Sequence, residues 1–262
     1  MRIAIIAGNV TAGSAGLVSR QTVSLLRDWG CTVDLLRPEE QTQDLTEMSA
    51  RYDVMLLNSR STAALATSSV YHAQGANLLN AYPTVLAAGD PAVAARTLQL
   101  AGLHVPPTWL TTRPRELSTV AEHTRLILRG AYGRRSRLIG TADDLPVADG
   151  QPFLLQRFES ADELPITVLQ VGDAVFWNTA GTATEPSSVP STSLRDLAVE
   201  AGRAFGTDLI GLTVVISEGR PYVVDVSAVP DLRRVPEAGL RLAEYVYAAA
   251  TAVSTTGPGS RP

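Results

Sequence analysis

The alternation of short apolar segments with helix-like segments constrains the fold of this chain more than any single residue. In the first 80 residues, apolar segments at 2–7, 31–36 and 52–58 alternate with amphipathic segments, and the third is apolar enough to be buried on both faces of a sheet. A strand–helix–strand alternation predicts parallel strands joined by right-handed crossovers. We therefore expect an N-terminal parallel α/β unit.

In the remainder of the chain the pattern changes to that of an α+β unit. A helix is expected at 90–102, because Asp90 can cap its N-terminus and Pro91 fits its first turn. Two antiparallel hairpins are expected at 164–180 and 208–230, because each contains two apolar runs separated by a glycine turn. The sequence thus predicts a parallel sheet followed by antiparallel strands.

Composition excludes several classes of function. The chain has 262 residues, 45% of them apolar, and a net charge of −4, so it can form a sizeable core but lacks the basic face that a broad nucleic-acid interface needs. Cys31 is the only cysteine, which excludes a disulfide framework and a paired-cysteine metal site, and we expect it to be buried. No apolar run reaches the length of a membrane span, so we expect a cytoplasmic protein without a membrane or nucleic-acid partner.

A glycine-containing segment follows the first expected strand and leads into a helix-like segment. It matches the Walker A pattern at Gly8 and Gly13, but Ser14 stands where that pattern requires its phosphate-binding lysine. Two interpretations remain open, a flexible loop in which Ser14 caps the helix or a loop that contacts a ligand at the carboxyl edge of the sheet. A mononucleotide P-loop is the weakest interpretation of the segment.

Five segments follow one another in an order that is informative as a set. They are a short strand and helices that end in Pro-Pro-Thr, a strand–loop–strand unit, an apolar strand ending in Gln-Arg-Phe, a Val-Gly hairpin, and a strand pair with Asp225 near its end. In that order they lie at residues 75–108, 126–139, 153–163, 166–176 and 204–232. The order resembles that of the ATP-grasp ligases, which include glutathione synthetase, D-alanine–D-alanine ligase and the amino-acid carrier ligases of lysine biosynthesis. The resemblance covers nearly the whole chain.

The resemblance implies a fold of three parts and a ligase activity. The parts are an N-terminal parallel α/β domain at 1–82, a central ATP-grasp subdomain at 83–150 and a C-terminal ATP-grasp subdomain at 151–253. The turn and linker composition of residues 254–262 predicts a disordered tail after them. Ligases of this class use Mg²⁺ and ATP to convert a small-molecule or peptide carboxylate into an acyl phosphate, which an amine or thiol then attacks. A homodimer or a complex with another protein is compatible with this class.

The resemblance also implies a set of nucleotide-binding residues. Arg129 takes the place of the phosphate-binding lysine at the end of a central strand, in a chain whose 22 basic residues are all arginine. Pro91 stands where the family has a second lysine, which a proline cannot replace. Arg129 and Asp225 are the implied catalytic residues. The other implied nucleotide-binding residues are Arg134, Arg135, Gln156, Arg157, Phe158 and Asp162.

The implied metal site has fewer carboxylate ligands than the site of the family. Thr213, Asp225 and Ser227 stand where the family has Asp followed by Glu-x-Asn, so one carboxylate remains of two. Mg²⁺ usually takes one or two carboxylates together with phosphate oxygens and water. Two functions therefore remain open: a diverged ligase, and a catalytically impaired protein of the same fold that acts as a binding or regulatory partner.

The resemblance changes the interpretation of the glycine segment near the N-terminus. It places ATP between later segments of the chain, so the N-terminal unit is expected to serve the substrate. Backbone N–H groups near Gly8, Asn9, Gly13 and Ser14 would then contact the substrate rather than ATP.

Overall fold

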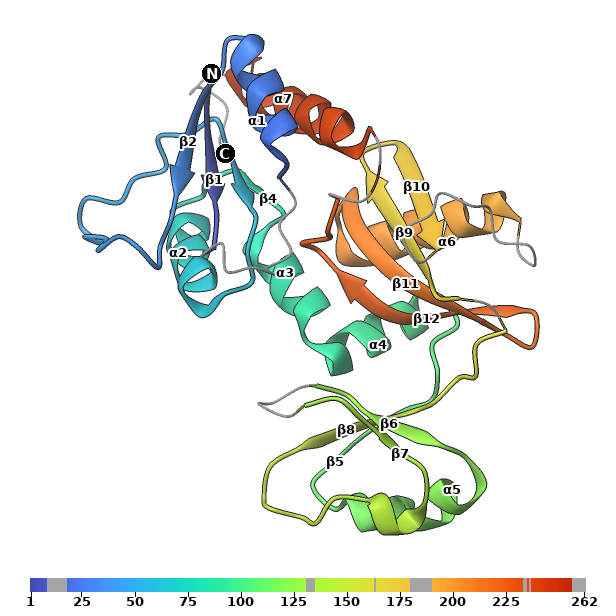
Figure 1. Cartoon of the computed structure of the whole chain (residues 1–262). Helices are drawn as coiled ribbons and strands as arrows, with labels where there is room; N and C mark the ends of the chain where they lie inside the picture. Colours follow the sequence, from blue (N-terminus) through green and yellow to red (C-terminus); the bar gives the residue numbers. More distant parts are fainter. Residues whose placement is uncertain are drawn as a thin grey trace.

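A computed structural model of the chain describes residues 1–8, 18–130, 135–162, 164–179, 190–232, 235 and 237–255. Within these residues the strands form three four-stranded sheets, one of them parallel and two antiparallel (Figure 1). Along the chain, helices alternate with the strands of all three sheets. This architecture confirms the expected succession of an α/β unit and an α+β unit.

The N-terminal sheet is parallel throughout, as the alternation of segments predicts. Its strands, in spatial order, are β2 (Thr32–Leu36), β1 (Arg2–Ile6), β3 (Val54–Leu57) and β4 (Leu78–Leu79). Helices α1 (Arg20–Asp28) and α2 (Thr62–Ala73) connect them. All four residues of β3 are buried, which explains its continuous apolar sequence. Cys31 is buried as expected, and burial raises the pKa of its thiol.

The N-cap of α1 corrects one interpretation of the glycine segment. The helix begins at Arg20, and the Ser19 hydroxyl accepts a hydrogen bond of 3.1 Å from the backbone N–H of Thr22. Ser19 therefore caps the helix, which removes the role in capping that one interpretation gave to Ser14. Ser14 itself lies outside the described residues.

The central sheet forms a lobe with its own core. Its strands, in spatial order, are β5 (Thr108–Thr111), β8 (Phe153–Arg157), β6 (Leu126–Leu128) and β7 (Arg137–Ile139), with α5 (Ser118–His123) beside them. Phe153 and Leu155 of β8 belong to the core of this lobe. The sheet thus extends past the boundary expected at residue 150, because β8 pairs with β5 and β6 rather than with the C-terminal strands. We call this part the small lobe.

The C-terminal sheet consists of the two expected hairpins. Its strands, in spatial order, are β10 (Ala174–Thr179), β9 (Ile166–Val171), β11 (Leu209–Ser217) and β12 (Arg220–Ser227), accompanied by α6 (Ser191–Phe205) and α7 (Ala238–Thr255). The hairpins turn at Gly172 and Gly219, both with a positive φ angle that favours glycine. Helix α7 includes residues 254 and 255, which we expected in the tail, and residues 256–262 lie outside the described part. No helix in the described part of the chain is both long and apolar enough to cross a membrane.

Helices α3 (Tyr82–Gly89) and α4 (Pro91–Leu100) pack on the C-terminal sheet, although we expected them in the central subdomain. The Asp90 carboxylate accepts hydrogen bonds from the N–H groups of Ala92 (2.9 Å) and Val93 (3.3 Å), which confirms it as the N-cap of α4. Buried residues of α3 and α4 belong to the same hydrophobic core as the C-terminal sheet, and not to the core of the small lobe. These residues are Val85, Ala88, Ala94 and Leu98.

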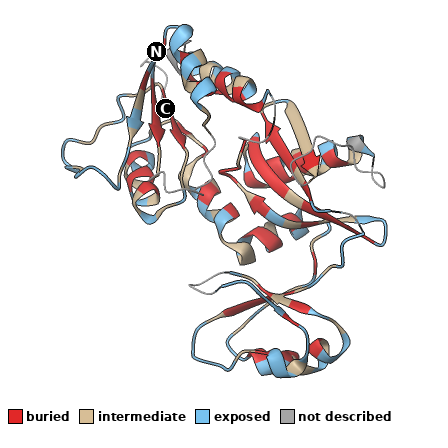
Figure 2. Ribbon diagram, viewed as in Figure 1, coloured by how far each residue is buried: buried red, intermediate tan, exposed pale blue. Residues whose placement is uncertain are grey.

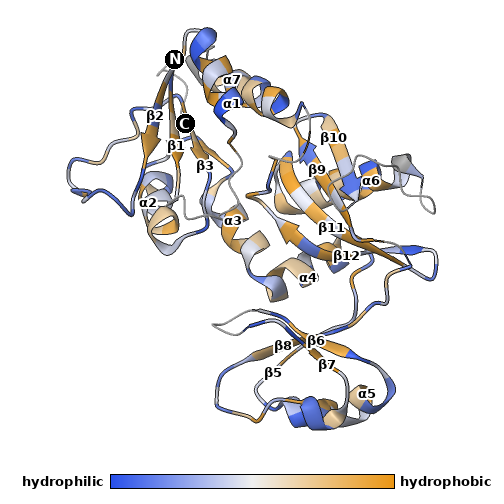
Figure 3. Cartoon of the chain, in the orientation of Figure 1, coloured by the Kyte–Doolittle hydropathy of each residue, from blue (hydrophilic) through white to orange (hydrophobic). Residues whose placement is uncertain are grey.

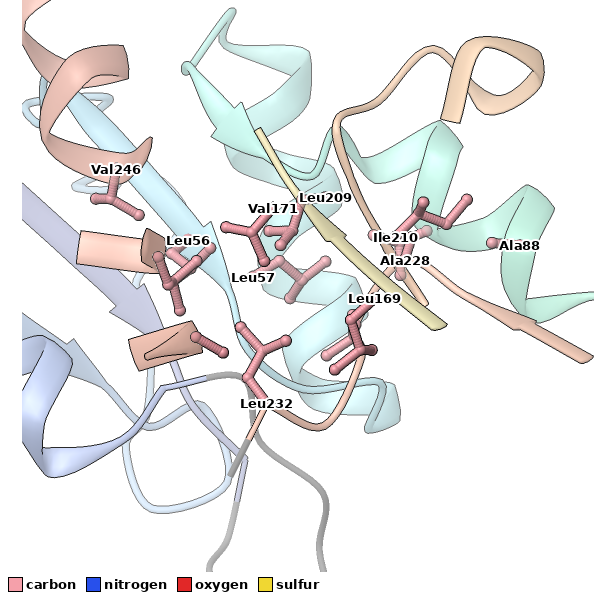
Figure 4. Close-up of a cluster of buried hydrophobic side chains, with 14 of the residues drawn as sticks. Leu56, Leu57, Ala88, Leu169, Val171, Leu209, Ile210, Ala228, Leu232 and Val246 are labelled. Carbon is pink, nitrogen blue, oxygen red and sulfur yellow. The ribbon is translucent and has the colours of Figure 1, made fainter. Parts of the chain in front are cut away.

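One continuous core joins the N-terminal and C-terminal sheets. Figure 4 shows Leu57 of β3 close to Val171 of β9 and Leu209 of β11. The buried and hydrophobic residues concentrate on β1, β3, β9 and β11 (Figures 2 and 3). The two sheets thus form a single large body, from which the small lobe stands apart (Figure 1).

The side chain of Asn80 forms buried hydrogen bonds inside this large body. The residue follows β4 and is only 3% exposed. Its Nδ2 donates hydrogen bonds to the carbonyls of Leu209 (2.6 Å) and Ala228 (2.7 Å), and its Oδ1 accepts one from the Thr207 hydroxyl. One side chain therefore links the edge of the parallel sheet to β11 and to the residue that follows β12.

Gly211 of β11 lies in close contact with Pro230 and Leu169. A Cβ atom at this position would lie 2.7 Å from the Cβ of Pro230 and 3.1 Å from a methyl group of Leu169. We expect Gly211→Ala to lower the free energy of unfolding by about 1–3 kcal/mol, because overpacking displaces neighbouring atoms. Urea denaturation followed by circular dichroism measures the loss. Gly89→Ala is the matched control, since a Cβ there meets nothing within 4 Å, and an equal loss in both variants would contradict the close approach at Gly211.

Candidate active-site cleft

A cavity of about 190 Å³ lies between the small lobe and the large body. Leu154 and Gln156 of β8 form one wall, and α4 and residues 223–226 of β12 form others. Successive residues of a strand face opposite sides, so Phe153 and Leu155 fill the core of the small lobe while Leu154 and Gln156 face this cavity. We call it the cleft cavity, and it lies between the segments for which the resemblance implies a nucleotide.

Two oppositely charged residues meet across the cleft cavity. Arg129 follows β6, and its backbone N–H continues the sheet by donating to the Leu154 carbonyl at 2.9 Å. Its guanidinium forms an ion pair of 2.8 Å with the carboxylate of Asp225 on β12, with the two side chains 19% and 57% exposed. The two residues that the resemblance implies as catalytic are 96 positions apart in sequence, and the structure brings them into contact.

The expected metal ligands share one face of the second hairpin. Thr213 of β11 pairs directly with Asp225 of β12, and Ser227 is two positions further along the same strand, so their side chains share a face. The Ser227 hydroxyl already accepts a hydrogen bond of 3.1 Å from the N–H of Val229. No group of three or more His, Cys, Asp or Glu residues suited to a metal occurs in the described ranges. One carboxylate and two hydroxyls fit Mg²⁺ only if phosphate oxygens and water complete its coordination.

The three consecutive residues Gln156, Arg157 and Phe158, which the resemblance implies as nucleotide contacts, separate into two groups. Gln156 is buried in the cavity wall, and its Nε2 donates to the Thr108 hydroxyl at 3.0 Å. Arg157 lies on the opposite face of β8, where its Nε donates to Glu159 at 2.7 Å, and this hydrogen bond raises the pKa of the guanidinium. Phe158 lies beneath the guanidinium of Arg125, 5.1 Å from its ring centroid. The structure brings Gln156 to the cleft cavity but not the side chains of Arg157 and Phe158.

Of the other predicted nucleotide contacts, Asp162 and Arg135 lie away from the cavity, and Arg134 lies outside the described residues. The Asp162 carboxylate accepts a hydrogen bond of 3.0 Å from the N–H of Gly219, so it stabilises the turn between β11 and β12. Arg135 is exposed and is not part of the cavity wall.

The described end of the glycine segment lies at the carboxyl edge of the parallel sheet. A Cβ atom at Gly8 would overlap the hydroxyl of Ser59, so the chain after β1 touches the chain after β3. The predicted contacts at Asn9, Gly13 and Ser14 lie outside the described residues.

Arg60 is a cavity residue that the sequence analysis missed. It follows β3 and lines both the cleft cavity and a neighbouring cavity of about 510 Å³, which we call the side cavity. A signal for it exists in the sequence, because ligands of open α/β sheets bind beyond the carboxyl ends of the strands.

Comparison with known proteins identifies the fold through structure rather than through sequence. No protein-family model matches the sequence, and no curated protein matches it. A crystal structure of a RimK domain ATP-grasp protein from Sphaerobacter thermophilus superposes with a TM-score of 0.74 at 19% identity, covering 94% of this chain and 100% of the other. The D-alanine–D-alanine ligase of Bacillus anthracis complexed with ATP has a TM-score of 0.71 at 14% identity, over 98% of this chain and 99% of the other.

A third similar structure is that of an ATP-grasp ligase in complex with a peptide. The ATP-grasp ligase PsnB, complexed with a precursor peptide and AMPPNP, has a TM-score of 0.70 at 17% identity, over 95% of this chain and 97% of the other. All three similarities extend over nearly the full length of both chains. The chain therefore has the fold of the ATP-grasp ligases, as the order of its segments predicted.

Proposed function

We propose that this protein is a diverged ATP-dependent ligase, which uses Mg²⁺ and ATP to join a carboxylate to an amine or thiol. The observation that carries the proposal is the Arg129–Asp225 ion pair inside the cleft cavity. It presents one cation and one carboxylate from opposite lobes, at the residues for which the resemblance implies contacts with Mg·ATP.

The two charges of the ion pair match the two charged parts of a magnesium–nucleotide complex, the phosphates and the metal. Phosphate oxygens can take over the guanidinium of Arg129, and the metal can take over the carboxylate of Asp225 with the hydroxyls of Thr213 and Ser227 beside it. Bound Mg·ATP would supply the phosphoryl group that activates the carboxylate. Gln156 and Leu154 close the wall of the small lobe and limit the access of water to this point.

The ligands of two similar structures support the use of a nucleotide by this chain. One holds ATP, and another holds AMPPNP together with a precursor peptide. A peptide or a small molecule is therefore a reasonable carboxylate substrate for this chain.

Trapping with hydroxylamine tests the ligase activity. We expect the protein, incubated with Mg·ATP, hydroxylamine and a panel of amino acids, acylated amino acids and dipeptides, to form a hydroxamate and ADP in equal amounts for at least one carboxylate. Mass spectrometry measures both products. Arg129→Ala and Asp225→Asn should form neither, because each removes half of the ion pair.

A second candidate function is a nucleotide-binding protein without ligase activity. Two observations favour it: Pro91, which has no charge, lines the cleft cavity, and Asp225 is the sole acidic residue among the described residues that line it. Saturable binding of Mg·ATP without ADP formation for any carboxylate in the panel would favour this candidate over the ligase.

A further inference from the structure

The side cavity combines an apolar wall with one cation. Leu65 of α2, Val85 and Leu86 of α3 and Pro91 of α4 supply aliphatic surface, Arg60 supplies a positive charge, and Asp90 supplies a negative charge. Arg60 and Pro91 also line the cleft cavity, as do Gly89 and Gly130. A group bound at Arg60 would therefore lie at the junction of the side cavity with the site proposed for ATP.

Arg60 differs from Arg129 in its ion pairs within the part of the chain that the structure describes. The guanidinium of Arg129 is paired with Asp225. Arg60 is exposed and makes no ion pair with any residue that the structure describes. The carboxylate of Asp90, which also lines the side cavity, caps α4 through hydrogen bonds from Ala92 and Val93. The side cavity thus offers a positive charge beside an aliphatic surface, which suits a ligand with a carboxylate and an apolar group.

We propose, on the basis of the function proposed above, that the side cavity is the subsite for the carboxylate substrate and selects a carboxylate that carries an aliphatic group. Arg60 holds the carboxylate, and Leu65, Val85 and Leu86 enclose the aliphatic group. The volume of about 510 Å³ lies within the range of sites for small organic ligands.

Acylated probes, which carry a carboxylate without an ammonium group, separate the contribution of Arg60 from that of the Asp90 carboxylate, which lines the same cavity.

Binding measurements without nucleotide test this assignment. The probes are N-acetyl-L-leucine, its amide, which lacks the negative charge, and N-acetylglycine, which lacks the aliphatic group. Titrations followed by NMR on the full chain give their dissociation constants. We expect N-acetyl-L-leucine to bind at least about tenfold more tightly than the amide, as a charge-assisted hydrogen bond implies. We expect it also to bind at least about threefold more tightly than N-acetylglycine.

Two variants with matched controls locate the binding. Arg60→Gln should abolish the preference for acid over amide, and Leu86→Ser should reduce the preference for the leucine probe. Arg96→Gln and Leu100→Ser are the controls, since both side chains are exposed on α4 and line neither cavity. Leu86 and Leu100 are 43% and 71% exposed, so both serine variants should fold.

The outcomes separate this inference from the proposed function. Equal binding of acid and amide, or unchanged binding by Arg60→Gln, would overturn the inference, even in protein that binds Mg·ATP. A carboxylate preference that depends on Arg60, in protein that fails to bind Mg·ATP, would overturn the ligase proposal and leave the side cavity as a carboxylate site.

Discussion

Asn80→Ala should lower the free energy of unfolding by about 3 kcal/mol, because the variant loses three hydrogen bonds at a buried position. The carbonyls of Leu209 and Ala228 lose a donor that water cannot easily replace, since Asn80 is 3% exposed. Urea denaturation followed by circular dichroism measures the difference.

Asn77→Ala is the matched control for this prediction. The Nδ2 of Asn77 donates one hydrogen bond, of 3.2 Å, to the Asp53 carbonyl at a partly buried position, so its loss should cost about 1 kcal/mol or less. Similar small losses in both variants would show that Asn80 does not hold the two sheets of the large body together.

Arg129→Ala should weaken the binding of ATP at least about tenfold, with or without Mg²⁺, because it removes the guanidinium that lies beside Asp225 in the cleft cavity. Arg129→Lys keeps the charge and should retain most of the affinity. Arg137→Ala is the control within the same sheet, since Arg137 donates to the Asp144 carbonyl and does not line the cavity. Isothermal titration calorimetry measures all three variants.

Asp225→Asn should remove the contribution of Mg²⁺ to the affinity for ATP rather than the contribution of the phosphate-binding cation. It keeps the size of the side chain but removes the carboxylate, so the gain in ATP affinity that Mg²⁺ provides should largely disappear. Binding of ATP in EDTA should be unchanged or stronger, because Arg129 is released from its ion pair. If Asp225→Asn and Arg129→Ala weakened binding equally in EDTA, the assignment of cation and metal ligand to separate roles would be wrong.

Local patterns in the sequence predict most of the fold. The fully buried β3 requires a continuous apolar segment, and the two C-terminal hairpins require glycine at their turns. The assignment of β8 failed because its partners β5 and β6 are distant in sequence, and no local pattern specifies such pairing. One of the two open interpretations placed the N-cap of the first helix at Ser14 rather than Ser19, because the two serines are chemically equivalent and only the backbone geometry distinguishes them.

The candidate site is predictable to a smaller extent. The resemblance implies Arg129 and Asp225, and the structure places them in contact, although their roles remain predictions. The alternation of side chains along β8 separates Gln156 from Arg157, a rule that could have been applied to the sequence. Arg60 was missed because it reaches the cavities only through the packing of α3 and α4 against the C-terminal sheet.

Calorimetric titration of the wild-type protein with ATP, in saturating Mg²⁺ and in EDTA, tests most directly whether the cleft cavity holds Mg·ATP. We predict saturable binding of one ATP per chain, at least about tenfold tighter with Mg²⁺, because Asp225 is then engaged by the metal and Arg129 by phosphate. At 100 times its dissociation constant the ligand should also stabilise the protein by about 2.7 kcal/mol. The absence of saturable binding at millimolar ATP under both conditions would contradict nucleotide binding by this protein.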